Sequence, residues 1–180
     1  MSIIFLILTC LSFLSFIVYN SVAIGLFGIP GSMSKTYYLY EEKKKGLGWL
    51  FTGFMLLMGM TMMPGWIEIS NAKGPWESYL TFLAFIAAAM IVFVGFAPRY
   101  RENLEGSVHM TSAKICAAAA LIWDFVVCWE IWYVPICGAV IPAIVATATK
   151  TWKSGRDYWL EMIAFDATFA TIITELALKI

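Results

Sequence analysis

The segment IIFLILTCLSFLSFIVYNSVAIGLF, residues 3–27, contains no charged side chain. A transmembrane helix needs about 20 consecutive, mostly apolar residues to cross the hydrocarbon core of a bilayer. This run is long enough, and it lacks the basic residues that precede the short apolar core of a secretory signal peptide. We therefore expect a retained helix that spans a membrane.

The composition of the whole chain places it among integral membrane proteins. Of its 180 residues, 61% are hydrophobic and 13% are charged, whereas average soluble domains carry about 25% charged residues. A soluble domain of this length has too little interior to bury so much apolar surface. The formal net charge is zero, which gives no electrostatic reason to expect nucleic acid as a partner.

Five further segments have the length and composition of membrane-spanning helices. They are continuously apolar, and none shows the alternation of a transmembrane β-barrel strand. We expect one domain, residues 1–180, built as an all-α polytopic bundle of six transmembrane helices with a short interfacial helix after the first. The predicted spans are residues 3–27, 47–67, 79–97, 111–129, 132–149 and 158–177.

Basic residues predict the orientation of these spans, because cytoplasmic loops are rich in lysine and arginine. Ten basic side chains fall in or beside the first, third and fifth loops, and two fall on the other side: Lys35, Lys43, Lys44, Lys45, Arg99, Arg101, Lys114, Lys150, Lys153 and Arg156, against Lys73 and Lys179. We expect a multi-pass membrane protein, with these three loops cytoplasmic and both termini outside.

Tryptophan is enriched at membrane interfaces, and the positions of the tryptophans agree with the predicted spans and their orientation. Three tryptophans fall at the predicted cytoplasmic surface, four at the outer surface and one inside a span: Trp49, Trp152 and Trp159; Trp66, Trp76, Trp129 and Trp132; and Trp123. The distribution of basic residues and the positions of the tryptophans therefore both indicate an even number of spans.

The connector after the first span contains glycine, serine and lysine in GIPGSMSK, residues 28–35. A phosphate-binding loop requires G-x-x-x-x-G-K-[ST] between a strand and a helix, and here the second glycine comes too early and a membrane helix precedes it. We instead expect Ser32 or Ser34 to cap a short helix from about Met33 to Lys43. This helix would lie among lipid headgroups, which makes membrane lipids the expected partners.

Several ionisable side chains lie within or beside the predicted spans. A charge at the centre of a membrane helix costs about 2.5 to 3.5 kcal/mol on insertion scales, so these residues need an explanation. They either line a polar, cytoplasm-facing cavity between the fourth, fifth and sixth helices, or form buried ion pairs that fix the helix packing. The candidate ligand-binding residues are His109, Lys114, Asp124, Glu161 and Asp166, with Ser32 and Ser34 in a lid over the cavity.

The sequence offers little support for catalysis or for a cofactor. A single histidine excludes a bis-histidine haem and a histidine-rich zinc site, and no serine lies in a nucleophile-elbow pattern. We therefore expect no cofactor or metal and assign no catalytic residue. Cys128 and Cys137 flank a predicted outer turn, but the sequence does not decide whether they form a disulfide.

Three functions stay open at this stage. The leading one is a transporter-like or ligand-binding membrane protein whose small-molecule ligand enters the polar cavity. Methionines in the second span, GFMLLMGMTMMPGW, are a residue type that can line a pocket for an apolar ligand. One alternative is a non-catalytic membrane scaffold or envelope-interaction factor. The other is a lipid-modifying enzyme that uses His109 and Glu161 as acid and base. Each of these functions is compatible with a monomer or an oligomer.

Several stretches resemble those of small multi-span membrane proteins that gut Bacteroidota and their tailed phages encode. The stretches are FGIPGSMSKTYYLYEEKKKGLGWLFT, MPGWIE, TFLAFIAAAMIVFVGFAPR, VHMTSAKICA and YWLEMIAF. The resemblance implies a bacterial or phage origin, a location in a bacterial inner membrane and the same six-span layout, and it transfers no activity. It includes Ser32, Ser34, His109 and Glu161, whereas Asp124 and Asp166 lie outside these stretches.

Overall fold

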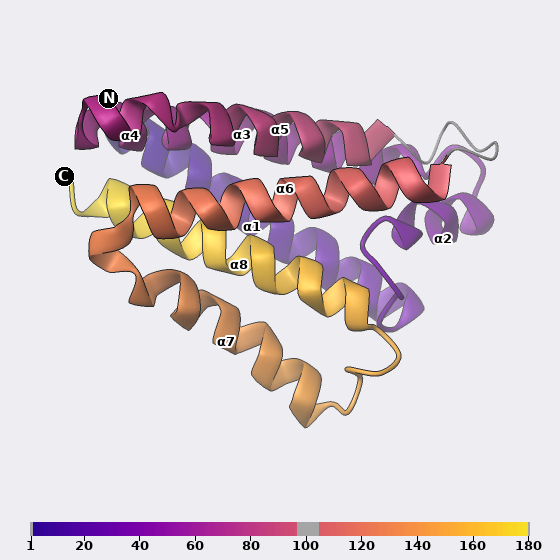
Figure 1. Cartoon of the computed structure of the whole chain (residues 1–180). Coiled ribbons are helices and arrows are strands. Elements are labelled where there is room, and N and C mark those ends of the chain that lie inside the picture. Colours follow the sequence, from indigo (N-terminus) through magenta and orange to yellow (C-terminus); the bar gives the residue numbers. More distant parts are fainter. Residues whose placement is uncertain (1, 97–104, 180) are drawn as a thin grey trace.

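The computed structural model describes residues 2–96 and 105–179, although the side chains of residues 2 and 105–110 are outside the description. In these residues the chain is a helical bundle without strands (Figure 1). The elements in chain order are α1 (Ser2–Phe27), α2 (Lys35–Lys43), α3 (Trp49–Lys73), α4 (Pro75–Tyr79), α5 (Thr81–Phe96), α6 (Glu105–Val127), the 3₁₀ turn η2 (Trp129–Ile131), α7 (Tyr133–Ala148) and α8 (Arg156–Ala177).

The all-helical class is confirmed for the described residues, and three of their segments are long and apolar enough to cross a membrane. These are Ile3–Phe27, Trp49–Lys73, and Pro75–Phe96, which combines α4 with α5. The α6 and α8 helices have 23 and 22 residues. The α7 helix has 16 residues and a length of about 24 Å, which is shorter than a hydrocarbon core of about 30 Å.

Large apolar side chains cover the outside of the bundle. On α1, Leu11 and Leu14 are 54% and 57% exposed, and on α7, Ile141 and Ile144 are 66% and 60% exposed. Apolar surface on this scale is unfavourable in water and marks contact with a membrane or a partner. This exposed apolar surface is compatible with the membrane environment that the composition predicts.

Small residues allow the helices to approach closely. Ala87 on α5 and Ala119 on α6 are buried. Between α7 and α8 the approach is closest at Gly138, where an added Cβ would lie 2.6 Å from the backbone oxygen of Asp166. The α7 helix packs along α8 at the edge of the bundle (Figure 1).

The connector between α1 and α3 folds against the start of α8. Its helix α2 begins at Lys35, two residues later than predicted, and the Ser32 hydroxyl accepts a 3.3 Å hydrogen bond from the Lys35 N–H. Ser34 makes no capping bond; its hydroxyl lies 3.1 Å from that of Ser32. The Tyr158 N–H donates to the Gly31 carbonyl at 3.1 Å, which ties the connector to α8.

Candidate ligand-binding cavity

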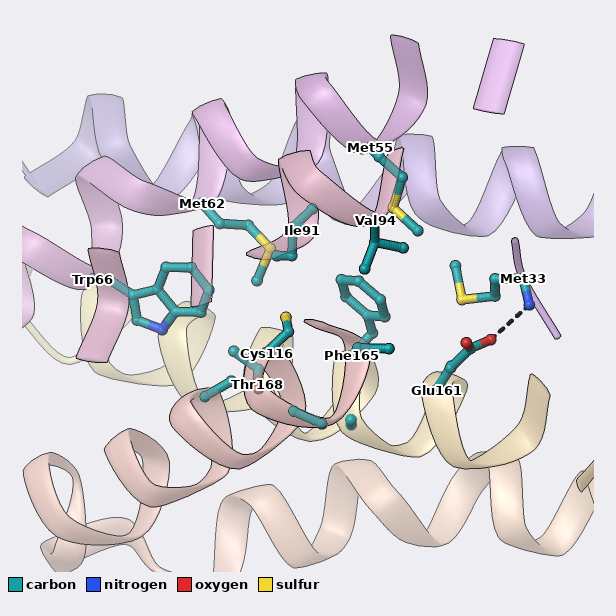
Figure 2. Close-up of a pocket in the computed structure, with 14 residues that line it drawn as sticks. Met33, Met55, Met62, Trp66, Ile91, Val94, Cys116, Glu161, Phe165 and Thr168 are labelled. Carbon is teal, nitrogen blue, oxygen red and sulfur yellow. Dashed lines mark hydrogen bonds between the residues drawn. The ribbon is translucent and has the colours of Figure 1, made fainter. Parts of the chain in front are cut away.

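A cavity of about 60 Å³ lies inside the bundle, between α3, α5, α6 and α8. The connector closes one end with the side chain of Met33, which is fully buried. The walls are mostly apolar: Met55 and Met62 from α3, Phe165 from α8, and aliphatic or small residues from α5 and α6 (Figure 2). Since a water molecule needs about 10 to 15 Å³ of such space, the cavity holds a few waters or a slender group.

The cavity is elongated along the bundle. Met33 and Glu161 lie at one end and Trp66 and Thr168 at the other, as Figure 2 shows. Glu161 and Thr168 are seven residues apart on α8, which corresponds to about 10 Å along the helix axis. The shape suits an extended chain better than a compact molecule.

Glu161 supplies the carboxylate at the first end. Its Oε2 accepts a 2.6 Å hydrogen bond from the backbone N–H of Met33. Within the part of the chain that the structure describes, no basic side chain forms an ion pair with it. A carboxylate in an apolar cavity is stable when it gains a cationic partner or holds a proton.

The other end of the cavity contains polar groups with unused hydrogen-bonding capacity. Trp66 is 1% exposed, and its indole N–H has no partner among the described residues. The Thr168 hydroxyl donates a 2.9 Å hydrogen bond to Oδ2 of Asp124, which is fully buried. Oδ1 of Asp124 has no partner in the same set of residues. Buried polar groups are normally paired, so this end offers hydrogen-bonding capacity to a further polar group.

The structure brings some of the predicted site residues to this cavity and leaves others away from it. Glu161 lines it, and Asp124 adjoins it through Thr168. Lys114 is exposed, and Asp166 is not among the lining residues. His109 belongs to α6, but its side chain lies outside the described residues.

The position of the cavity differs from the expected one. We expected walls from the fourth, fifth and sixth spans, but α7, the fifth, supplies none of the lining residues, and α3 and α5 take its place. In the predicted lid, Ser32 and Ser34 do not line the cavity, whereas Met33 between them does. The four cysteines are free, so the structure contains no bridge between Cys128 and Cys137.

Sequence reasoning missed Met33, Trp66 and Thr168 as site residues. The methionine-rich second span was the useful signal, because Met55 and Met62 belong to it. Trp66 was predicted to lie at the depth of the outer membrane surface, and within the bundle its indole is buried and packs edge to face on Trp123, with ring centroids 6.2 Å apart. No sequence signal separates a buried tryptophan near a helix end from an interfacial one.

Comparisons with known proteins identify no relative of this chain. No family model matches it, and neither a curated protein nor a solved structure matches it. The resemblance to small membrane proteins of gut Bacteroidota and their phages therefore stays a prediction. In the described residues no three histidine, cysteine or acidic side chains gather in a way that could hold a metal ion.

Proposed function

We propose that the chain crosses a bacterial inner membrane six times, with both termini outside and the first, third and fifth loops in the cytoplasm. The bias of ten basic residues against two supports this orientation. The arrangement of the bundle also supports an even number of crossings, because α1 begins and α8 ends at the same end (Figure 1). In this orientation Glu161 and Met33 lie toward the cytoplasm.

We further propose a transporter-like binding function, in which the cavity takes a slender amphiphile with a cationic head. The observation that carries the proposal is the position of Glu161: a carboxylate beside apolar walls, with one backbone hydrogen bond and no basic partner among the described side chains. The ammonium group of the ligand would supply the missing positive charge. Its alkyl chain would lie along Met55, Met62 and Phe165, where methionine side chains adapt to an irregular apolar shape.

Binding of octylammonium to the purified protein in lipid nanodiscs tests this function. We expect the Glu161→Gln variant to bind it about thirtyfold more weakly or worse, because removing one member of a buried charge pair costs roughly 2 kcal/mol or more. Octanol and octanoate have the same chain without the positive charge, and we expect both to bind weakly to the wild type. Titration calorimetry measures all of these.

Asp166→Asn is the matched control, since it neutralises another acidic residue of α8 that does not line the cavity. We expect it to bind octylammonium as the wild type does. Equal binding by the wild type and Glu161→Gln would contradict the proposal. It would leave the scaffold and lipid-modifying alternatives, for which the cavity carboxylate has no role in capturing a cation.

A further inference from the structure

We infer that the inner end of the cavity, formed by Trp66 and Thr168, is a second subsite that binds a hydroxyl group of the ligand. This inference rests on the proposed function, because it takes the cationic end of the ligand to be held at Glu161. It narrows the ligand class to an extended amphiphile that carries an ammonium group at one end and a hydroxyl group at the other.

The first argument is the unpaired donor of Trp66. The neighbouring Trp123 is equally buried and donates its indole N–H to the Ser70 hydroxyl at 2.9 Å. Trp66 differs because it lines the cavity and has no partner among the described residues. A buried N–H that is left unpaired is costly, and an acceptor on a ligand that reaches this end of the cavity would pair with it.

The second argument concerns Thr168, which also lines the cavity. A threonine hydroxyl has one proton and two lone pairs, and the proton of Thr168 is already donated to Asp124. Thr168 can therefore offer acceptor positions to the cavity, whereas Trp66 can only donate. A ligand group that accepts from Trp66 and donates to Thr168 uses both, and a hydroxyl does this, while a carbonyl or an ether uses Trp66 alone.

The third argument is distance. The rise along α8 between Glu161 and Thr168 is about 10 Å, which sets the separation of the two polar ends of the ligand. The walls between them are apolar, with Phe165 and Met62 beside the path. A straight chain of intermediate length therefore fits better than a short chain, which cannot reach both ends, or a long one, which must fold.

The test compares octylammonium with the amino-octanol that carries its hydroxyl at the far end of the chain. In the wild type we expect the amino alcohol to bind up to about tenfold more tightly, the gain of one well-made hydrogen-bonded contact in a buried site. The butyl pair, which is too short to bridge the cavity, should show no such gain. In Trp66→Phe the advantage of the amino alcohol should disappear while octylammonium still binds, which also shows that the variant is folded.

The outcomes separate this inference from the proposed function. If octylammonium binds in a Glu161-dependent manner but the hydroxyl adds nothing at any chain length, water occupies the inner end and the second subsite is refuted while the proposed function stands. If neither compound binds the wild type, both are refuted. Should Trp66→Phe fail to fold, the indole N–H resonance of Trp66 in the wild type decides: a shift with the amino alcohol and none with octylammonium supports the subsite, and identical spectra overturn it.

Discussion

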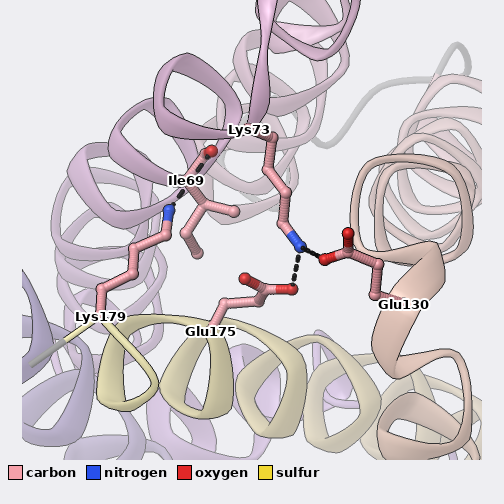
Figure 3. A network of polar contacts seen from close by, with 5 residues as sticks. All are labelled: Ile69, Lys73, Glu130, Glu175 and Lys179. Carbon is pink, nitrogen blue, oxygen red and sulfur yellow. Dashed lines mark hydrogen bonds and ion pairs between the residues drawn. The ribbon is translucent and has the colours of Figure 1, made fainter.

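Two glutamates on α8 lie at opposite ends of the bundle, and among the described residues Glu175 has a basic partner whereas Glu161 has none. Glu175 contacts the ammonium group of Lys73 at 2.6 Å, and the same ammonium reaches Glu130 at 2.7 Å (Figure 3). Glu161 lies about 21 Å away along the helix and has the Met33 N–H as its hydrogen-bond donor. The two residues are of one type on one helix, so their surroundings alone set them apart.

The comparison distinguishes Glu175, whose carboxylate holds the fold together, from Glu161, whose carboxylate is proposed to bind a ligand. Lys73 ends α3, Glu130 belongs to η2 and Glu175 to α8, so their contacts join three elements at that end of the bundle. Lys179 adds a 3.5 Å hydrogen bond to the carbonyl of Ile69 nearby. At the other end of the bundle, no described basic side chain forms an ion pair with Glu161. The cavity beside Glu161 could admit the cationic group of a ligand.

The largest effect should follow the loss of Lys73. The Lys73→Met variant leaves Glu175, whose side chain is 5% exposed, without its partner. Breaking a buried ion pair costs about 3 kcal/mol or more, so we expect a loss of that size in the free energy of unfolding, measured by denaturant titration in detergent.

Two further variants test the cause. Adding Glu175→Gln to Lys73→Met removes the unpaired charge and should restore most of the stability. Lys153→Met, which replaces an exposed lysine, should change stability by less than about 0.5 kcal/mol. A Lys73→Met variant as stable as the wild type would mean that Glu175 needs no partner, and the contrast with Glu161 would lose its basis.

Glu161→Gln should have a smaller effect and one of the opposite sign. Glutamine keeps an oxygen that can accept the Met33 N–H and removes a carboxyl group that has no basic partner among the described residues. We therefore expect the free energy of unfolding to stay the same or rise by up to about 1 kcal/mol, while Glu175→Gln lowers it. Denaturant titrations of the two variants side by side measure the contrast, and equal losses in both would show that Glu161 is a structural residue as well.

The smallest effect concerns pH and Glu130. The hydrogen bond and the positive charge of Lys73 lower the pKa of Glu130 below its ordinary value of 4.5. Because the folded-state pKa lies below the unfolded one, this contact stabilises the fold above about pH 4.5 and its contribution is lost as the pH falls through the folded-state pKa. The effect is small, since the Glu130 side chain is 59% exposed and solvent screens it.

Thermal unfolding of the wild type and of Glu130→Gln should show this dependence. We expect a slightly higher Tm for the wild type at neutral pH and no difference in acid. In a Lys73→Met background the Glu130→Gln change should have no effect at either pH. A difference that persists in acid would show that Glu130 acts through contacts other than its charge.

Much of the fold could be predicted because hydrophobic composition acts locally along the chain. The first predicted span, residues 3–27, differs from α1 by one residue at its start. The second is less accurate: α3 continues to Lys73, beyond the predicted end at 67, since residues 68–73 stay helical although they are polar in part. The α2 helix begins two residues after the predicted start; the Ser32 hydroxyl accepts a hydrogen bond at its beginning, and Ser34, which directly precedes the helix, makes no capping bond.

The candidate site was harder to predict because it depends on which helix faces which. Glu161 was identified as a polar residue in an apolar segment, and that signal is local. The sequence analysis grouped Lys114 with it as a candidate ligand-binding residue, but Lys114 is exposed and does not line the cavity. Met33 and Trp66 come from segments far from α8 in sequence, and their presence at one cavity depends on the packing of α3 and the connector against it.

The sequence by itself determined the helical class, the positions of the apolar segments and the presence of costly acidic residues within them, because each is a property of consecutive residues. The tertiary structure decided which of these acids has a partner. It joined Lys73 to Glu175 across α3 and α8, and it placed Glu161 beside an apolar cavity. The physical reason is that an ion pair depends on a few ångströms between side chains of different helices, a distance that no local pattern encodes.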